Sequence, residues 1–93
     1  MAKLRSFSQV LNRLTKIAKE ELHKTMSRKD LSNISLVRFV AIHINLSEKQ
    51  TEYRFKNCNW SLGEWADVLR LANSDRLQQA TNEEFTQHRN ELS

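Results

Sequence analysis

Proline and glycine are almost missing from this chain of 93 residues, which has no proline and a single glycine, Gly63. A phosphate-binding loop needs several residues without side chains, so that backbone N–H groups can approach the phosphates. Nucleotide-binding folds that depend on such a loop are therefore excluded. Turns must use Asn, Ser and Asp instead, because these residues form local hydrogen bonds. They cluster at 32–35, 57–61 and 73–75, where we expect the element boundaries.

Cysteine and long apolar runs are equally scarce. Cys58 is the only cysteine, so no intramolecular disulfide can form, which fits a reducing compartment. No apolar run approaches the ~20 residues of a bilayer-spanning helix, and the N-terminus lacks the apolar centre of a signal peptide. We expect a soluble, cytoplasmic protein that makes no membrane contact and folds as a single domain over residues 1–93.

The net charge of +4 is unevenly distributed along the chain. Residues 1–30 carry a surplus of five positive charges and residues 31–60 a surplus of two, whereas residues 61–93 carry a surplus of three negative charges. Such an asymmetry attracts a polyanion at one end of the molecule and repels it at the other. Compensation between the two parts within the fold is the competing interpretation.

Residues 6–26 have the clearest periodic pattern. Apolar side chains recur there at spacings of three and four, namely Phe7, Val10, Leu11, Leu14, Ile17, Ala18, Leu22 and Met26. This spacing predicts an amphipathic helix with one apolar stripe. Ser6 and Gln9 fit a capping box, in which each side chain satisfies a free backbone N–H of the other residue.

Two strands are predicted after this helix. Residues 36–46 are rich in β-branched and aromatic side chains, and their even positions hold Leu36, Val40, Ile42, Ile44 and Leu46. Residues 50–57 alternate between Thr51, Tyr53 and Phe55 on one side and charged residues on the other. The short link between the two segments permits an antiparallel hairpin.

Residues 61–92 are predicted to be helical, with a break near 73–75. Ser61 and Glu64 fit a second capping box, and Trp65, Val68 and Leu69 follow it on an apolar face. The expected fold class is thus α+β in the order α-β-β-α, with the hairpin covered by the long N-terminal helix and the C-terminal helices. The open sheet edges suggest a homodimer formed by pairing across one edge.

The apolar stripes of the predicted elements define an expected core. Its members are Leu14, Ile17, Val40, Ile42, Phe55, Trp65 and Leu69. Tyr53, Phe55, Trp60 and Trp65 could stack on nucleic-acid bases if exposed, but their spacing fits core packing better.

No group of residues indicates a reaction. His23, His43 and His88 fall in three different predicted elements, and neither they nor Cys58 have the paired spacing of a zinc site. A nucleophilic role for Cys58 would need a histidine brought close by folding. We therefore expect no enzyme activity, no cofactor and no metal.

Residues 27–44 also resemble a helix-turn-helix, with Ser35–Arg38 as the start of a recognition helix. That motif usually has a small residue and a glycine, which this segment lacks, and its β-branched residues favour a strand.

Basic side chains on the expected exposed faces carry the leading functional hypothesis, a small non-enzymatic regulator that binds DNA or RNA. Lysine and arginine neutralise phosphates and release counterions, and a two-stranded ribbon can enter a major groove. The candidate contacts are Arg13, Lys16, Lys19, Lys24, Arg38, Arg54 and Lys56.

The alternative is a protein-binding inhibitor or adaptor, of the kind encoded by mobile elements, that blocks a host macromolecular complex. In this hypothesis exposed apolar residues such as Trp60, Phe85 or Leu92 fill a pocket of the partner, and the charges steer the encounter.

Overall fold

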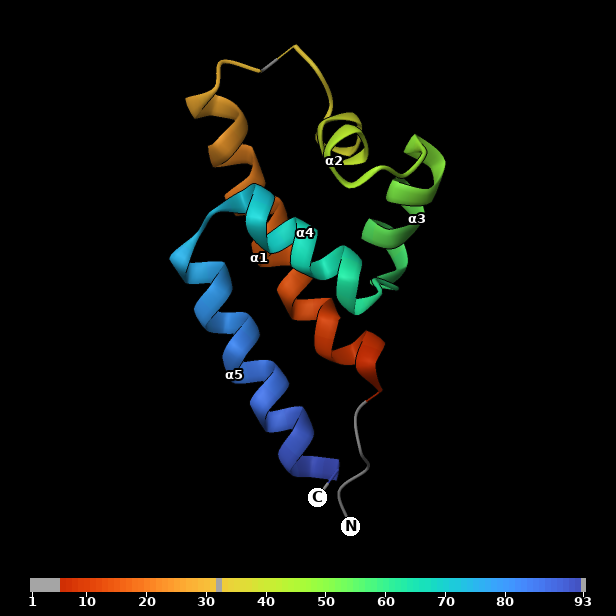
Figure 1. Cartoon of the computed structure of the whole chain (residues 1–93), viewed down its shortest axis with the longest axis vertical. Coiled ribbons are helices and arrows are strands. Elements are labelled where there is room, and N and C mark those ends of the chain that lie inside the picture. Colours follow the sequence, from red (N-terminus) through yellow and green to blue (C-terminus); the bar gives the residue numbers. More distant parts are fainter. Residues whose placement is uncertain (1–5, 32, 93) are drawn as a thin grey trace.

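Five α-helices run through the part of the chain that the computed structural model describes, residues 6–31 and 33–92. They are α1 (Phe7–Arg28), α2 (Leu36–Ile44), α3 (Glu48–Asn57), α4 (Leu62–Ala72) and α5 (Asp75–Leu92). In Figure 1, α4 crosses α1, α5 runs back alongside the first half of α1, and α2 and α3 lie together on the other side of α4.

The predicted N-terminal helix is present as α1. The Ser6 side chain accepts a hydrogen bond from the Gln9 backbone N–H, and the Gln9 side chain accepts one from the Ser6 N–H, as the capping box predicted. Most of the apolar stripe is buried, with Val10, Leu14 and Leu22 fully covered, and Phe7 and Ile17 are half-buried.

The prediction of an α+β fold was wrong. Residues 36–46, expected as a strand, form α2, and residues 50–57, expected as its partner, lie in α3. No residue of 6–31 or 33–92 is in a strand. The hairpin is absent from these residues, and so is the sheet edge on which the expected homodimer depended.

The error has a physical cause, since a short apolar run fits a buried helix as well as a strand. In α2 the buried residues Val40, Ala41 and Ile44 follow a spacing of three and four along one helical face. In α3, Thr51 and Phe55 are four apart, a distance that satisfies both the alternation of a strand and one turn of a helix. Ser47 and Gln50 form a capping box at the start of α3, a signal that the strand interpretation passed over.

Left-handed residues end three of the helices in the near absence of glycine. Asn45, Cys58 and Asn73 cap α2, α3 and α4 with φ values of 58°, 53° and 46°. Asparagine tolerates this conformation through local hydrogen bonds, which is why Asn-containing clusters mark element ends in this chain. Ser32, in the first of the predicted clusters, lies outside the described residues.

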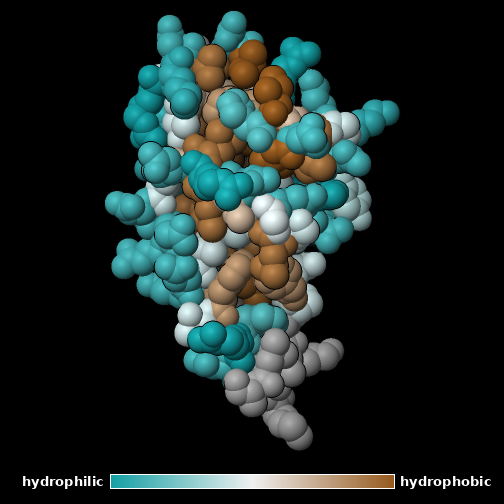
Figure 2. Space-filling model, viewed as in Figure 1, coloured by the Kyte–Doolittle hydropathy of each residue, from teal (hydrophilic) through white to brown (hydrophobic). Residues whose placement is uncertain are grey.

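One core joins all five helices. Trp60 and Trp65 are buried at its centre, and their rings meet at 5.9 Å. The Trp60 Nε1–H donates to Thr15 Oγ1 and the Trp65 Nε1–H donates to Thr81 Oγ1, both at 3.3 Å, so each buried indole has a polar partner. Figure 2 shows apolar side chains along the middle of the molecule and polar ones along its edges.

The expected core is largely present, with one clear exception. Leu14, Val40, Phe55 and Trp65 are buried, and Ile17 and Leu69 are half-buried against them. Ile42 was predicted to be buried but is 67% exposed. Its even position pointed inward only in a strand, whereas in α2 the helical turn carries it to the outer face.

No helix of the described segments is long and apolar enough to cross a lipid bilayer.

Candidate nucleic-acid interface

The seven basic residues predicted to contact nucleic acid lie on three helices. Arg13, Lys16, Lys19 and Lys24 belong to α1, Arg38 to α2, and Arg54 and Lys56 to α3. Six of the seven are exposed, and Arg54 is half-buried. The structure separates them into two groups, according to whether a carboxylate of the same chain neutralises them.

Arg54 is part of the structural framework between α3 and α4. Its Nε donates to Glu64 Oε1 at 2.8 Å and its Nη2 donates to Glu64 Oε2 at 3.2 Å, a bidentate pair in which both side chains are about four-fifths covered. The pair lowers the pKa of Glu64, chiefly through the hydrogen bond from Arg54, and raises the pKa of Arg54. Glu64 also accepts the Ser61 N–H in the α4 capping box. Arg54 is therefore not available to a phosphate.

Three further candidates also form ion pairs. Arg13 binds Glu84 of α5 at 2.8 Å, Lys24 binds Glu21 at 2.9 Å, and Arg38 binds Glu48 of α3 at 2.9 Å. All three cations remain exposed, so a phosphate can reach them only in competition with these carboxylates.

Lys16, Lys19 and Lys56 have no carboxylate partner among the described residues. The Lys19 ammonium lies 5.7 Å from the centroid of the Phe55 ring, which brings α1 and α3 together at this point. Lys16 precedes Lys19 by nearly one turn, and Lys56 follows Phe55 directly. The three lysines thus extend from α1 onto α3.

A fourth lysine, Lys49, was not among the predicted contacts. It is exposed, has no carboxylate partner in the described part of the chain, and precedes Lys56 by seven residues, or two helical turns. The capping box of Ser47 and Gln50 predicts that a helix begins at residue 48, and in a helix Lys49 and Lys56 lie on the same side. We call Lys16, Lys19, Lys49 and Lys56 the lysine face.

Tyr53 is the one predicted stacking residue found on the surface, at 52% exposure, on the outer side of α3. Phe55, Trp60 and Trp65 belong to the core, as the preferred interpretation had it. The burial of Trp60 also removes it from the residues proposed to fill a partner's pocket.

The histidines and the cysteine form no metal site. Within residues 6–31 and 33–92, no three side chains of His, Cys, Asp or Glu lie close enough together to hold a metal ion. Cys58 is buried with its Sγ 3.8 Å from Asn12 Oδ1. His43 Nδ1 lies 2.8 Å from the backbone oxygen of Phe39, one turn earlier in α2.

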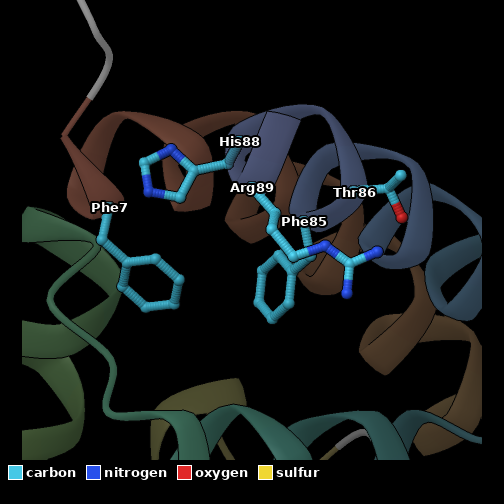
Figure 3. Close-up of a pocket in the computed structure, with 5 residues that line it drawn as sticks. All are labelled: Phe7, Phe85, Thr86, His88 and Arg89. Atoms are coloured by element: carbon cyan, nitrogen blue, oxygen red, sulfur yellow. The ribbon is translucent and has the colours of Figure 1, made fainter. Parts of the chain in front are cut away.

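A separate cavity of about 350 Å³ opens between the start of α1 and the end of α5. Phe7, Phe85, Thr86, His88 and Arg89 line it. Figure 3 shows the Phe7 and Phe85 rings pointing in the same direction, with Thr86 turned away from them; the ring centroids are 5.5 Å apart. Phe85 is thus a lining residue of a hollow rather than a protruding side chain, and the side chain of Leu92 lies outside the described part of the chain.

No family model matches this chain, and neither a curated protein nor a solved structure matches it significantly. Its function must therefore be argued from its own residues.

Proposed function

We propose that this protein is a small non-enzymatic regulator that binds nucleic acid through the lysine face and acts in the cytoplasm. The observation that carries the proposal is the contrast between two groups of cations. Arg13, Lys24, Arg38 and Arg54 bind carboxylates of the same chain, whereas the four lysines of the face do not. Unpaired positive charge is therefore present on parts of α1 and α3 that the Lys19–Phe55 contact brings together, in addition to Arg28 and Lys29 at the end of α1.

Counterion release supplies the affinity. Each lysine that neutralises a phosphate of B-form DNA contributes ~0.9 to the slope of the logarithm of the binding constant against the logarithm of salt concentration. Four such contacts give a slope of about −3.6, so affinity should fall roughly 100-fold between ~50 and ~200 mM salt.

The carboxylates between α1 and α5 fit this arrangement. Glu84 is buried and binds Arg13, and Glu20 and Glu21 both bind Arg76 of α5. These carboxylates are neutralised on the α1–α5 side of the molecule, so their repulsion of a polyanion at the α3 side is reduced.

The test is a titration of labelled DNA and RNA with wild-type protein and two matched double variants. Lys16→Gln with Lys56→Gln removes two charges from the lysine face, and Lys24→Gln with Lys29→Gln removes two elsewhere on α1 and just beyond it. The first should weaken binding and reduce the salt slope by about 2, and the second should leave the slope near its original value. Absence of binding to any nucleic acid at ~50 mM salt, or equal effects of the two variants, would overturn the proposal.

The cavity between α1 and α5 favours a second candidate function, a protein-binding inhibitor or adaptor that blocks a host complex. Its phenyl rings, Phe7 and Phe85, could receive an apolar side chain of a partner. A protein that co-purifies after nuclease treatment, is lost with Phe85→Ala and is retained with Lys16→Gln and Lys56→Gln would support this candidate. Circular dichroism of Phe85→Ala should confirm that the variant folds, and retention of the partner by that folded variant would refute the candidate.

A further inference from the structure

The α2 and α3 helices form a compact pair with a short connection. Only residues 45–47 separate Ile44, the last residue of α2, from Glu48, the first residue of α3. Figure 1 shows α2 nearly end-on while α3 is seen more along its length, so the two helices cross steeply. Two short helices joined in this way by three residues are the geometry of a helix-turn-helix.

The turn has the backbone conformation that this motif needs. Asn45 is left-handed, with φ 58° and ψ 46°, and its N–H donates to the Ala41 carbonyl oxygen. The Leu46 N–H donates to the same oxygen at 3.2 Å. Asn45 therefore takes the place of the glycine often found in such turns.

The inner side of the turn is packed. Ala41, in the last turn of α2, is a small and buried residue. Thr51 is fully buried, and its hydroxyl donates to the Ser47 carbonyl oxygen at 2.9 Å, while the Ser47 hydroxyl accepts the Gln50 N–H at 3.1 Å. Arg38 of α2 and Glu48 of α3 form an ion pair across the outside of the turn at 2.9 Å. The two hydrogen bonds stabilise the first turn of α3 itself, and the Arg38–Glu48 ion pair links α3 to α2.

In the sequence, the segment that resembled a helix-turn-helix was residues 27–44, which lacks the usual small residue and glycine. In the structure, the two helices with this geometry are instead α2 and α3, which cover residues 36–57. In the α2–α3 pair Ala41 is the small residue and Asn45 replaces the glycine.

The outer side of α3 is unoccupied by the rest of the described chain. Lys49, Glu52, Tyr53 and Lys56 are exposed, and their spacing of three and four places them on one side of the helix. The ten residues of α3 span about 15 Å, and the major groove of B-form DNA is ~12 Å wide and admits one α-helix. Lys19 of α1 lies on the flank of α3 next to Phe55, and Lys16 is nearly one turn before it in α1, so both could meet the phosphates beside the groove.

We propose that the α2–α3 pair is a helix-turn-helix and that the ligand of the lysine face is duplex DNA, with α3 in the major groove. This inference rests on the proposed nucleic-acid binding and narrows it to one class of ligand. Lys49 and Lys56 neutralise phosphates or donate to guanine, the Tyr53 ring contacts base edges such as the thymine methyl group, and Glu52 accepts from the cytosine amino group. The Glu52 carboxylate repels phosphates, so it improves the discrimination between bases and does not raise the affinity for DNA.

Double-stranded RNA is disfavoured by the same geometry. The major groove of A-form RNA is deep and too narrow to admit a helix, and recognition of RNA duplexes uses the shallow minor groove instead. A protein that inserts α3 should therefore distinguish the two duplexes even where their sequences and charges correspond.

The test compares one sequence as duplex DNA, duplex RNA and single-stranded DNA at ~100 mM salt, each ~25 base pairs or nucleotides long. Wild-type protein should prefer duplex DNA by ten-fold or more. Tyr53→Ala should weaken binding to duplex DNA about ten-fold without changing the salt slope, because it removes a groove contact and no charge. Leu62→Ala, at a residue 65% exposed on α4, is the matched control and should change nothing.

The outcomes separate this inference from the proposed function. Equal affinity for the three nucleic acids, or a Tyr53→Ala variant that folds and binds like wild type, would overturn the helix-turn-helix while leaving binding by the lysine face in place. Absence of binding to all three would overturn both. Selection from a random duplex library sharpens a positive result, since Glu52→Gln should then shift the preferred bases and raise affinity for unselected DNA.

Discussion

The layer formed by α1, α4 and α5 and the pair formed by α2 and α3 use their charges differently. Between α1 and α5, Arg13 meets Glu84, and Arg76 meets both Glu20 and Glu21. On the outer side of α3, Lys49 and Lys56 meet no carboxylate among the described residues. Ion pairs join α1 to α5, whereas the outer side of α3 carries two lysines that are left for an external ligand.

The two regions also differ in how apolar residues are placed. Every turn of α1 contributes a buried side chain to the core, but the nine residues of α2 are apolar on more than the inner face. Ile42 projects outward as a result, and Figure 2 shows apolar side chains on the surface over α2. The four predictions that follow test this contrast, beginning with the largest effect.

Shortening an apolar side chain should destabilise the protein strongly on the core-facing side of α1 and hardly at all on the outer side of α2. Leu14→Ala leaves a cavity at a fully buried site and should lower the free energy of unfolding by about 2–5 kcal/mol. Ile42→Ala removes a side chain that is mostly in water and should cost less than about 0.5 kcal/mol. Urea denaturation measures both, and similar losses in the two variants would contradict the placement of α2.

The ion pairs of the α2–α3 region should differ in strength according to burial. Arg54→Gln leaves the partly covered Glu64 carboxylate without its bidentate donor, so we expect a loss of about 1.5–3 kcal/mol. Arg38→Gln breaks a pair in which both side chains are more than half exposed, and we expect a loss of at most about 1 kcal/mol. Thermal or urea unfolding of the two variants compares them directly, and a larger loss for Arg38→Gln would be inconsistent with this arrangement.

The α1–α5 contact should be sensitive to acid. Glu21 accepts from the Ser74 hydroxyl at 2.5 Å and binds Lys24 and Arg76, and these contacts, the Ser74 hydrogen bond above all, lower the pKa of Glu21 to about 2. A carboxyl whose folded pKa is depressed contributes stability above its unfolded pKa of ~4.3 and loses it as the pH falls toward the folded value.

Wild-type protein should therefore lose this contribution between about pH 4.5 and pH 2, whereas Glu21→Gln, which has no charge to titrate, should show a smaller loss over the same range. Urea midpoints at pH 7, 4.5 and 2.5 measure the difference. Parallel pH profiles for the two proteins would show that Glu21 does not link α1 to α5 as the charged form.

The smallest effect concerns the single glycine. Gly63 lies in the first turn of α4, where an added Cβ would meet no atom within 4 Å. Gly63→Ala should therefore stabilise the protein by about 0.5–1 kcal/mol, since alanine loses less backbone entropy on entering a helix. A decrease in the melting temperature would contradict the open space beside Gly63 at the start of α4.

Regularity and length explain which elements could be predicted. The 22 residues of α1 repeat the helical spacing several times, so only one interpretation fits Val10, Leu14 and Leu22 together. In α2 and α3 the informative positions are few, and Thr51 and Phe55 fit either structure. For the candidate site, Lys16, Lys19 and Lys56 were found because lysines on expected exposed faces are visible in the sequence. Lys49 was missed because it was assigned to the link between two strands, whereas it lies in the first turn of α3.

The sequence by itself determined the local features of this protein. The serines at 6, 47 and 61, each followed three residues later by Gln or Glu, start α1, α3 and α4 through hydrogen bonds that span three residues, and Asn45 and Asn73 end two helices through their own backbone conformation. Only the tertiary structure decided which cations are free for a ligand. Arg13 and Glu84 are 71 residues apart and Arg76 and Glu20 are 56 apart, and such partners are chosen when helices pack, because an ion pair depends on distance in space and not on spacing along the chain.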